Sequence, residues 1–112
     1  MLTIYHNTRC TKSRSALQVL EENNIPHKIR FYTENMLTID ELSRLLKKLK
    51  MQPSELLRKN EDIYKELSKK PRTEEEWLQL MSEHPQLIER PIVVNGRKAI
   101  IARPPERVLD IL

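Results

Sequence analysis

The sequence predicts an α/β protein of the order βαβ, helical block, ββα, with an all-helical insertion at about 36–86. Three observations support this prediction. Alternating, β-prone segments occur near both ends of the chain, leucines at helical spacing fill its middle, and Pro, Asn and a single Gly mark the boundaries between segments. With 112 residues and no visible linker or repeat, the chain is expected to form one domain, residues 1–112, that includes the insertion.

The N-terminal segment predicts a strand, a helix and a second strand. Residues 2–6 alternate and are β-prone, which indicates a first strand. A polar loop leads into a helix over about 12–23, which the run Asn23-Asn24-Ile25-Pro26 ends. Residues 28–32 alternate again and indicate a second strand. Because a helix connects them at this spacing, the two strands should be parallel.

The middle of the chain predicts helices, beginning with one capped by Thr38 and Glu41. Threonine followed three residues later by glutamate is the pattern of a capping box. The leucines that follow recur on one helical face, as expected of a helix that packs against a core. They are Leu42, Leu45, Leu46 and Leu49.

Three shorter helical signals complete this block. Pro53 suits the first turn of a short helix. Asn60 can cap another helix, because its side chain can accept from a free backbone N–H. Thr73 and Glu76 repeat the capping-box pattern and predict a third helix.

The C-terminal segment predicts a hairpin and a last helix. Residues 92–94 and 99–101 are β-prone and flank Asn95-Gly96, which supplies the positive φ angles of a tight turn, so these strands should be antiparallel. Pro104 and Pro105 can open a helix. Its apolar face is expected to comprise Val108, Leu109 and Leu112. The complete order is that of a thioredoxin-like sheet with a helical insertion.

The positive charge of the chain is concentrated toward its two ends. The chain carries 20 Lys and Arg against 16 Asp and Glu, a net charge of +4, and the excess lies in 1–30 and 87–112. A positive field attracts anions, although on charge alone a mildly basic solvated surface is the simpler explanation. With 4% aromatic residues and no recognised nucleic-acid motif, the sequence argues against nucleic acid as a partner.

The compartment follows from the hydropathy pattern and the cysteine count. No apolar run approaches the roughly 18 residues needed to span a bilayer, and the first residues lack the apolar core of a signal peptide. We therefore expect no membrane partner and a cytoplasmic location, where a lone cysteine stays a free thiol. Cys10 is the only cysteine, which excludes a multi-cysteine zinc site and an internal disulfide, and no metal site is expected.

Cys10 has the setting of a reactive thiol. It lies between a predicted strand and the start of a predicted helix, where free amides and the helix dipole favour a thiolate. Arg9, Lys12 and Arg14 add positive charge, and such settings lower a cysteine pKa from about 8.5 to roughly 3.5–7.5. The hydroxyl of Ser13 could donate a hydrogen bond to the sulfur. The alternative is a buried, inert cysteine.

Two familiar thiol motifs are excluded. A thioredoxin-type Cys-x-x-Cys would need cysteine at Ser13. A loop of the tyrosine-phosphatase type would need arginine at Ala16. Cys10 therefore belongs to neither of these two classes.

Four motifs, in order across essentially the whole chain, resemble those of the glutaredoxin-linked arsenate reductase family. They are Tyr5-His6-Asn7-x-Arg9-Cys10-x-Lys12-Ser13-Arg14, Leu56-Leu57-Arg58-Lys59, Ile88-Glu89-Arg90-Pro91-Ile92-Val93-Val94 and Ala102-Arg103-Pro104. Each motif alone is weak, but the ordered set is specific.

The resemblance implies a catalytic cysteine and three oxyanion-binding arginines. The matching positions are Cys10 for the nucleophile and Arg58, Arg90 and Arg103 for the oxyanion. Arginine suits this role because it stays charged and its planar fork binds oxygen atoms in pairs. Taken without the resemblance, each arginine would be read as a surface residue.

Four further positions have expected supporting roles. His6 and Ser13 match family positions that maintain the thiolate, and Arg14 lies in the same motif. For His6 the alternative is a strand-end residue without a role. Pro91 matches the cis-proline that faces the cysteine in thioredoxin folds.

The resemblance also implies the chemistry and its partners. The thiolate attacks arsenate or a similar oxyanion, glutathione serves as co-substrate, arsenite leaves, and glutaredoxin resolves the remaining mixed disulfide. The absence of a second cysteine is consistent with this outside help. No bound cofactor is expected, and the protein should be a monomer.

Two other functions stay open. Thr11-Lys12 follows the cysteine where established arsenate reductases usually have Gly-Thr. One alternative is a different glutathione-dependent thiol enzyme on the same scaffold. The other is a regulator that binds RNA polymerase, similar to the related Spx proteins, although Ser13 in place of a second cysteine argues against a dithiol switch.

Overall fold

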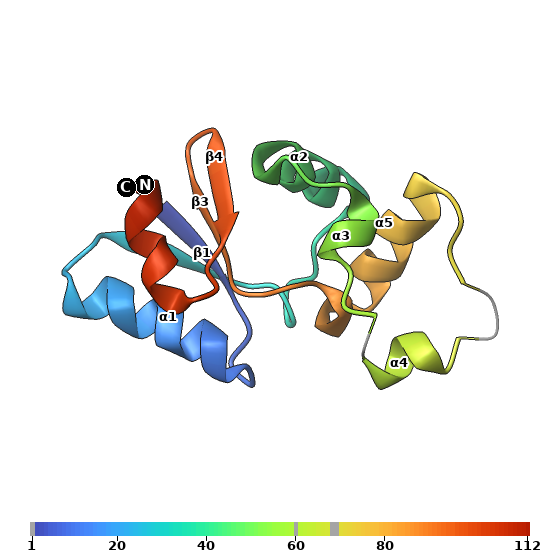
Figure 1. Cartoon of the computed structure of the whole chain (residues 1–112), viewed down its shortest axis with the longest axis horizontal. Helices are drawn as coiled ribbons and strands as arrows, with labels where there is room; N and C mark the ends of the chain where they lie inside the picture. The colour runs from blue at the N-terminus through green and yellow to red at the C-terminus, as the bar shows by residue number, and fades with distance from the viewer. Residues whose placement is uncertain (1, 60, 68–69) are drawn as a thin grey trace. The chain divides into compact units, whose positions relative to one another are not determined.

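The computed structural model describes residues 2–59, 61–67 and 70–112. The chain forms two compact units. The first, here the sheet unit, consists of Met1–Asn35 and Arg90–Leu112, and the second, the helical unit, of Met36–Glu89. Figure 1 shows both, with the sheet unit built from the two ends of the chain.

The sheet unit has a four-stranded sheet in the order β2-β1-β3-β4. Strand β1 pairs in parallel with β2 and antiparallel with β3, and β3 pairs antiparallel with β4. The βαβ unit and the C-terminal hairpin predicted from the sequence are therefore confirmed, as is the thioredoxin-like class. The elements are β1 (Leu2–His6), α1 (Thr11–Glu22), β2 (His27–Phe31), β3 (Ile92–Asn95), β4 (Lys98–Ile101) and the 3₁₀ helix η2 (Pro105–Ile111).

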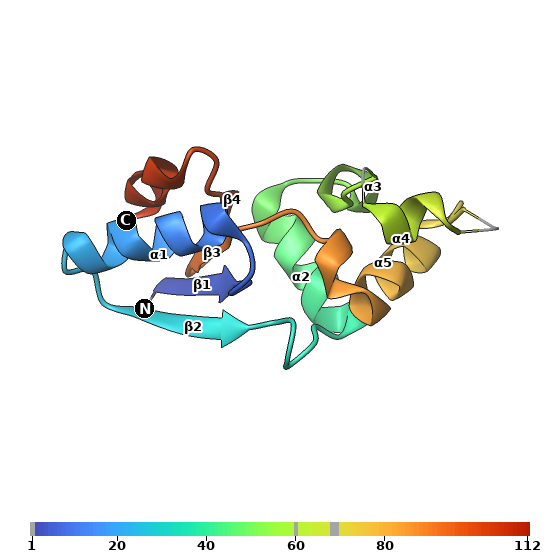
Figure 2. The ribbon, with the colours of Figure 1, turned by 90° about the horizontal axis from the view of Figure 1, so that it is seen from below.

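One face of this sheet carries the core of the unit. Helices α1 and η2 contact each other and lie together over the strands, as Figures 1 and 2 show. The alternating pattern of β1 explains this packing, because Leu2 and Ile4 point to the same face and are both buried. The buried cluster comprises Leu2, Ile4, Ala16, Leu20, Val93, Ala102, Val108 and Ile111.

The hairpin turn differs by one position from the expected one. Asn95 pairs with Lys98, so the two-residue loop is Gly96-Arg97 and not Asn95-Gly96. Gly96 has φ of 63°. Glycine at the first central position of such a loop supplies the positive φ that joins two twisted antiparallel strands.

The last helix is a 3₁₀ helix, and its buried face is not the predicted one. Val108 and Ile111 are buried, whereas Leu109 is 40% exposed and Leu112 62% exposed. A 3₁₀ helix has three residues per turn, so positions 108 and 111 lie directly above one another. The prediction of a face at 108, 109 and 112 assumed α-helical geometry and is wrong.

The helical unit begins with the predicted capping box. The Thr38 side chain accepts from the backbone N–H of Glu41 at 3.1 Å, and Glu41 accepts from the backbone N–H of Thr38 at 3.2 Å. At the second predicted capping box only half of the pattern forms. The Thr73 side chain accepts from the backbone N–H of Glu76, but the Glu76 carboxylate accepts from the backbone N–H of Arg72 and not from that of Thr73. The expected cap Asn60 lies outside the described residues.

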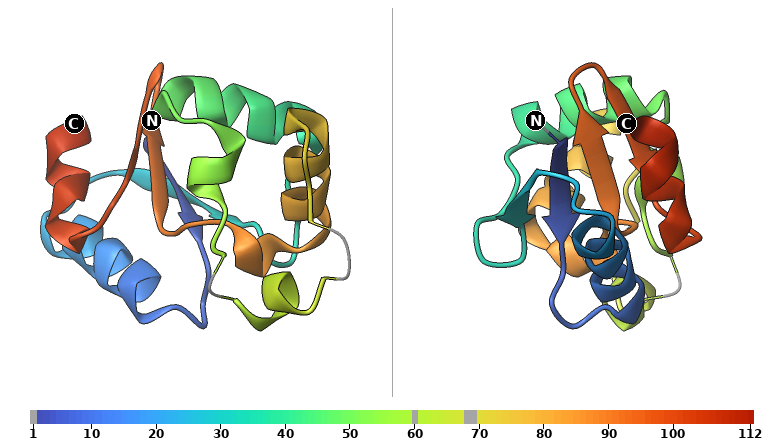
Figure 3. Two further views of the ribbon diagram at one scale, coloured as in Figure 1. Left: turned by 45° about the vertical axis from the view of Figure 1, so that its right-hand side comes forward. Right: turned by 90° about the vertical axis from the view of Figure 1, so that its left-hand side faces the viewer.

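Helix α2 packs against α5, and α3 also contacts α5. The left view of Figure 3 shows the helices of this unit. The elements of this unit are α2 (Ile39–Leu49), α3 (Pro53–Leu56), α4 (Asp62–Lys65), α5 (Glu74–Glu83) and η1 (Pro85–Leu87). Among the described residues, no helix is long and apolar enough to cross a membrane.

Candidate active site around Cys10

Cys10 is the residue that caps the N-terminus of α1. Its backbone is extended (φ −97°, ψ 119°), and its carbonyl accepts the helix's first hydrogen bond from the N–H of Arg14 at 3.0 Å. The N–H of Cys10 donates to the carbonyl of Asn7 at 3.0 Å, which closes the loop after β1. Cys10 is a free cysteine, and the residue is 9% exposed. This geometry holds the sulfur at the positive end of the helix dipole.

The environment of the sulfur favours the thiolate. Burial raises the pKa of the Cys10 thiol, but hydrogen bonds from the backbone N–H of Ser13 and from the Arg90 side chain outweigh it, aided by the Arg90 charge and the N–H of Lys12. The pKa therefore lies below its ordinary value. Arg90 is 80 positions away in the sequence, so spacing alone could not identify it as the neighbouring cation.

Ser13 supports the site in a different way from the one expected. Its hydroxyl is 2.6 Å from Nδ1 of His6 and accepts from the backbone N–H of Asn7 at 3.1 Å. It is the backbone N–H of Ser13 that bonds to the Cys10 sulfur. Ser13 thus fastens the end of β1 to the first turn of α1, which fixes the loop that carries the cysteine.

His6 is buried at the end of β1. Its ring meets Phe31 edge-on, with centroids 5.8 Å apart. Burial lowers the pKa of His6, and the charge of Arg14 lowers it further, so the ring is neutral at neutral pH. A neutral ring can accept from the Ser13 hydroxyl through Nδ1, which fits the 2.6 Å contact.

The basic residues next to Cys10 in the sequence differ in their contacts and exposure. Arg14 donates to the hydroxyl of Thr11 at 3.3 Å and acts electrostatically on His6. Arg9 and Lys12 are exposed, and Lys12 lowers the Cys10 pKa through its backbone N–H.

Arg90, Pro91 and Arg103 lie where the C-terminal hairpin begins and ends. The Arg90–Pro91 peptide bond is cis, and so is the Arg103–Pro104 bond, which was not predicted. Nε of Arg103 donates to the backbone carbonyl of Arg90 at 2.7 Å, and the N–H of Ala102 donates to the carbonyl of Pro91 at 2.9 Å. Arg103 is therefore held against the residue that contacts the thiol.

Arg58 belongs to the helical unit. Its Nε is 3.1 Å from a carboxylate oxygen of Glu89, and its Nη1 is 3.3 Å from one of Glu61. Neither carboxylate was predicted as a partner of Arg58, and no local pattern indicates the ion pair with Glu89, because the two residues are far apart in the chain. Of the predicted site residues, the sheet unit contains all except Arg58.

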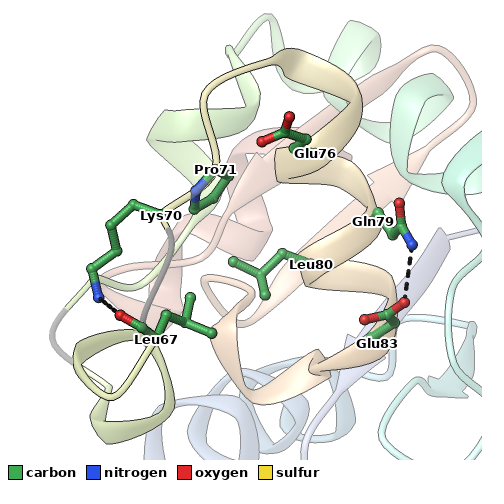
Figure 4. A pocket seen from close by; sticks show the side chains of 7 residues that line it. All are labelled: Leu67, Lys70, Pro71, Glu76, Gln79, Leu80 and Glu83. Atoms are coloured by element: carbon green, nitrogen blue, oxygen red, sulfur yellow. Dashed lines mark hydrogen bonds between the residues drawn. The ribbon is translucent and has the colours of Figure 1, made fainter.

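A cavity of about 260 Å³ lies in the helical unit, between Leu67 and one side of α5 (Figure 4). Leu80 and Leu67 line it, and Gln79 donates to Glu83 at 3.2 Å on its rim. None of its lining residues is a predicted site residue. Within the described parts of the chain, no group of three or more His, Cys, Asp or Glu side chains could hold a metal ion.

The chain is similar to known proteins over nearly its whole length. The model of the ArsC family matches residues 5–111. The arsenate reductase of Haemophilus influenzae is 42% identical over 112 residues, covering 97% of each chain. An uncharacterized Escherichia coli protein, YfgD, is 46% identical over 112 residues, covering 97% of this chain and 94% of that protein. A solved arsenate reductase from Vibrio cholerae has a TM-score of 0.92 and 40% identity, covering 99% of this chain and 97% of that one.

Proposed function

Because the chain belongs to the ArsC family, we propose that it reduces arsenate, or a similar oxyanion, with Cys10 as the nucleophile. One observation carries the proposal: Cys10 is the N-cap residue of α1, and the neighbouring Arg90 guanidinium lowers the pKa of its thiol. A thiolate is the nucleophilic form of cysteine, and a guanidinium beside it can hold an anion against it.

The first step is attack on arsenic. The Cys10 thiolate forms an As–S bond, and a hydroxide leaves the arsenate and is released as water after it takes up a proton. Arg90 stabilises the thiolate before the attack and the anionic oxygens afterwards. Because the guanidinium is already in place, little reorganisation accompanies the reaction.

The second step transfers two electrons. The sulfur of glutathione attacks Cys10, the As–S bond breaks, and its electron pair stays on arsenic, which leaves as arsenite. Two thiols have then become one mixed disulfide between Cys10 and glutathione. Glutaredoxin attacks this disulfide and returns the free Cys10 thiol. These reductants fit a reducing cytoplasm and a monomer whose sequence has one cysteine.

Arg58 and Arg103 complete the proposed oxyanion site. The hydrogen bond from Arg103 to the carbonyl of Arg90 supports the assignment of Arg103. For Arg58 the support is the isolated bridge that pairs Leu57 with Ile88, because this bridge ties Arg58 to the segment that leads into Arg90. Three arginines can neutralise the charge of a tetrahedral oxyanion and hold its oxygens in fixed directions.

The test is arsenate reduction with glutathione and glutaredoxin, comparing wild type with Cys10→Ser. We expect turnover in the wild type and none in the variant, because a serine hydroxyl is a poor nucleophile without a base. A mixed disulfide at Cys10 should be found by mass spectrometry when glutaredoxin is omitted. If the wild type has no activity although its thiol is activated, arsenate is not the substrate and another thiol-dependent reaction takes its place.

A further inference from the structure

The guanidinium of Arg58 is shared by two carboxylates. Glu89 approaches Nε at 3.1 Å and Glu61 approaches Nη1 at 3.3 Å. The side chains are 24%, 27% and 30% exposed for Arg58, Glu89 and Glu61, so the cluster is only partly shielded from water. Two formal negative charges therefore surround the single positive charge of Arg58. The proposed function gives this arginine the role of binding the oxyanion.

Backbone hydrogen bonds build this arrangement. The N–H of Arg58 donates to the carbonyl of Leu87 at 2.6 Å, and the N–H of Glu89 donates to the carbonyl of Leu56 at 2.8 Å. This antiparallel bridge fixes Glu89 beside Arg58. The N–H of Glu61 donates to the carbonyl of Arg58 at 3.3 Å, which closes a turn that returns Glu61 to the same guanidinium. Both carboxylates are thus placed by the backbone as well as by charge.

A carboxylate next to an anion-binding arginine discriminates between anions. An ionised carboxylate only accepts hydrogen bonds, so it repels an oxyanion that has no proton to donate. An oxyanion that keeps a hydroxyl can donate that proton to the carboxylate while its other oxygens bind the guanidinium. At neutral pH arsenate and phosphate keep at least one proton, whereas sulfate keeps none.

We propose that Glu89, assisted by Glu61, is a specificity-determining residue that selects tetrahedral oxyanions that carry a proton and rejects sulfate. The inference rests on the proposed function, because it requires Arg58 to bind the oxyanion. The arginines alone do not define the class of substrate, since guanidinium groups bind sulfate as readily as arsenate. The carboxylates add the discrimination between these anions.

The test measures the affinities of arsenate, phosphate and sulfate by isothermal titration calorimetry at constant ionic strength. Glu89→Gln keeps an oxygen that can accept from Arg58 and removes the charge. We expect the ratio of arsenate affinity to sulfate affinity to fall about tenfold in this variant, mainly because sulfate binds more tightly. That change corresponds to one charge-assisted hydrogen bond at a partly exposed site. Glu61→Gln should act in the same direction, and the double variant should lose more.

Two controls separate the possible outcomes. Glu83→Gln makes the same charge change at an exposed residue of the same unit whose carboxylate accepts from Gln79, and it should leave the preference unchanged. Arg58→Ala should weaken the binding of all three anions. If Arg58→Ala weakens binding but Glu89→Gln leaves the arsenate-to-sulfate ratio unchanged, the inference is wrong and the proposed function stands. If Arg58→Ala binds every anion as the wild type does, the assignment of Arg58 fails and the inference fails with it.

Discussion

Nε of Arg103 donates a hydrogen bond to the backbone carbonyl of Arg90 at 2.7 Å, although 13 positions separate the two residues. The hairpin explains this contact. Arg90 precedes β3 and Arg103 follows β4, so an antiparallel pair with a two-residue loop returns the second arginine to the first. Since the Arg90 side chain bonds to the Cys10 sulfur, Arg103 is fastened to the backbone of the residue that activates the thiol.

Arg103, which is half-buried, should therefore contribute to catalysis. We expect Arg103→Ala to lower kcat/KM for arsenate by about 10- to 150-fold, the loss of one hydrogen bond to a charged group. Arg103→Lys should restore activity only in part, because lysine keeps the charge but lacks the planar fork. Steady-state kinetics of the two variants beside wild type would measure this. An Arg103→Ala enzyme with wild-type kcat/KM would remove Arg103 from the proposed site.

The Cys10 thiol should ionise below the ordinary value of about 8.5. The lowered pKa means that the thiolate persists at pH values where a free thiol is protonated. Arg90→Ala should raise the midpoint, because it removes both the hydrogen bond and the charge. Arg97→Ala, in the exposed hairpin loop, is the matched control and should leave the midpoint unchanged. Iodoacetamide alkylation rates against pH would show this, and a wild-type midpoint at or above about 8.5 would contradict an activated thiol.

Acid should destabilise the sheet unit through His6. The pKa of His6 is lowered in the folded protein by burial and by Arg14, while in the unfolded chain it is about 6.5. As the pH falls through the unfolded value, the unfolded chain takes up a proton that the folded protein excludes, so the free energy of unfolding falls. Above that value the contribution is fully present.

Urea denaturation at several pH values between about 7 and 5 would measure this dependence. His6→Asn should flatten it, because asparagine has no titrating group and can still face Ser13. Arg14→Ala should flatten it in part, because the Arg14 charge is the second cause of the lowered pKa. If His6→Asn keeps the full wild-type dependence, another group is responsible.

Gly96 should be the most sensitive position of the hairpin loop. Its φ is +63°, and no atom lies within 4 Å of where a Cβ would be, so a substitution there meets backbone strain without a steric clash. We expect Gly96→Ala to cost about 1–2 kcal/mol of unfolding free energy and Gly96→Asn less, because asparagine tolerates the left-handed region. Denaturant midpoints would rank the variants. Equal stability of wild type and Gly96→Ala would mean that the loop adopts another turn.

Local features of the fold could be read from the sequence, and long-range ones could not. Thr38 and Glu41 form their capping box because both partners lie within one helical turn. The carboxylate of Glu76 accepts from the backbone N–H of Arg72 instead of the N–H of Thr73, which a complete capping box requires. No local pattern could show that Arg90 bonds to Cys10, because the order of the strands brings them together.

The last helix shows how a change of helical period alters the core. Val108 is fully buried, whereas Leu109 is 40% exposed. We therefore expect Val108→Ala to cost about 2 kcal/mol or more, through the two lost methyl groups and the cavity they leave. Leu109→Ala should cost only about 0.5 kcal/mol, as is usual for a surface substitution. An α-helical face at 108, 109 and 112 would make both changes costly, so equilibrium denaturation of the two variants distinguishes the geometries. A large cost for Leu109→Ala would favour the α-helix, because only that helix turns Leu109 toward the strands.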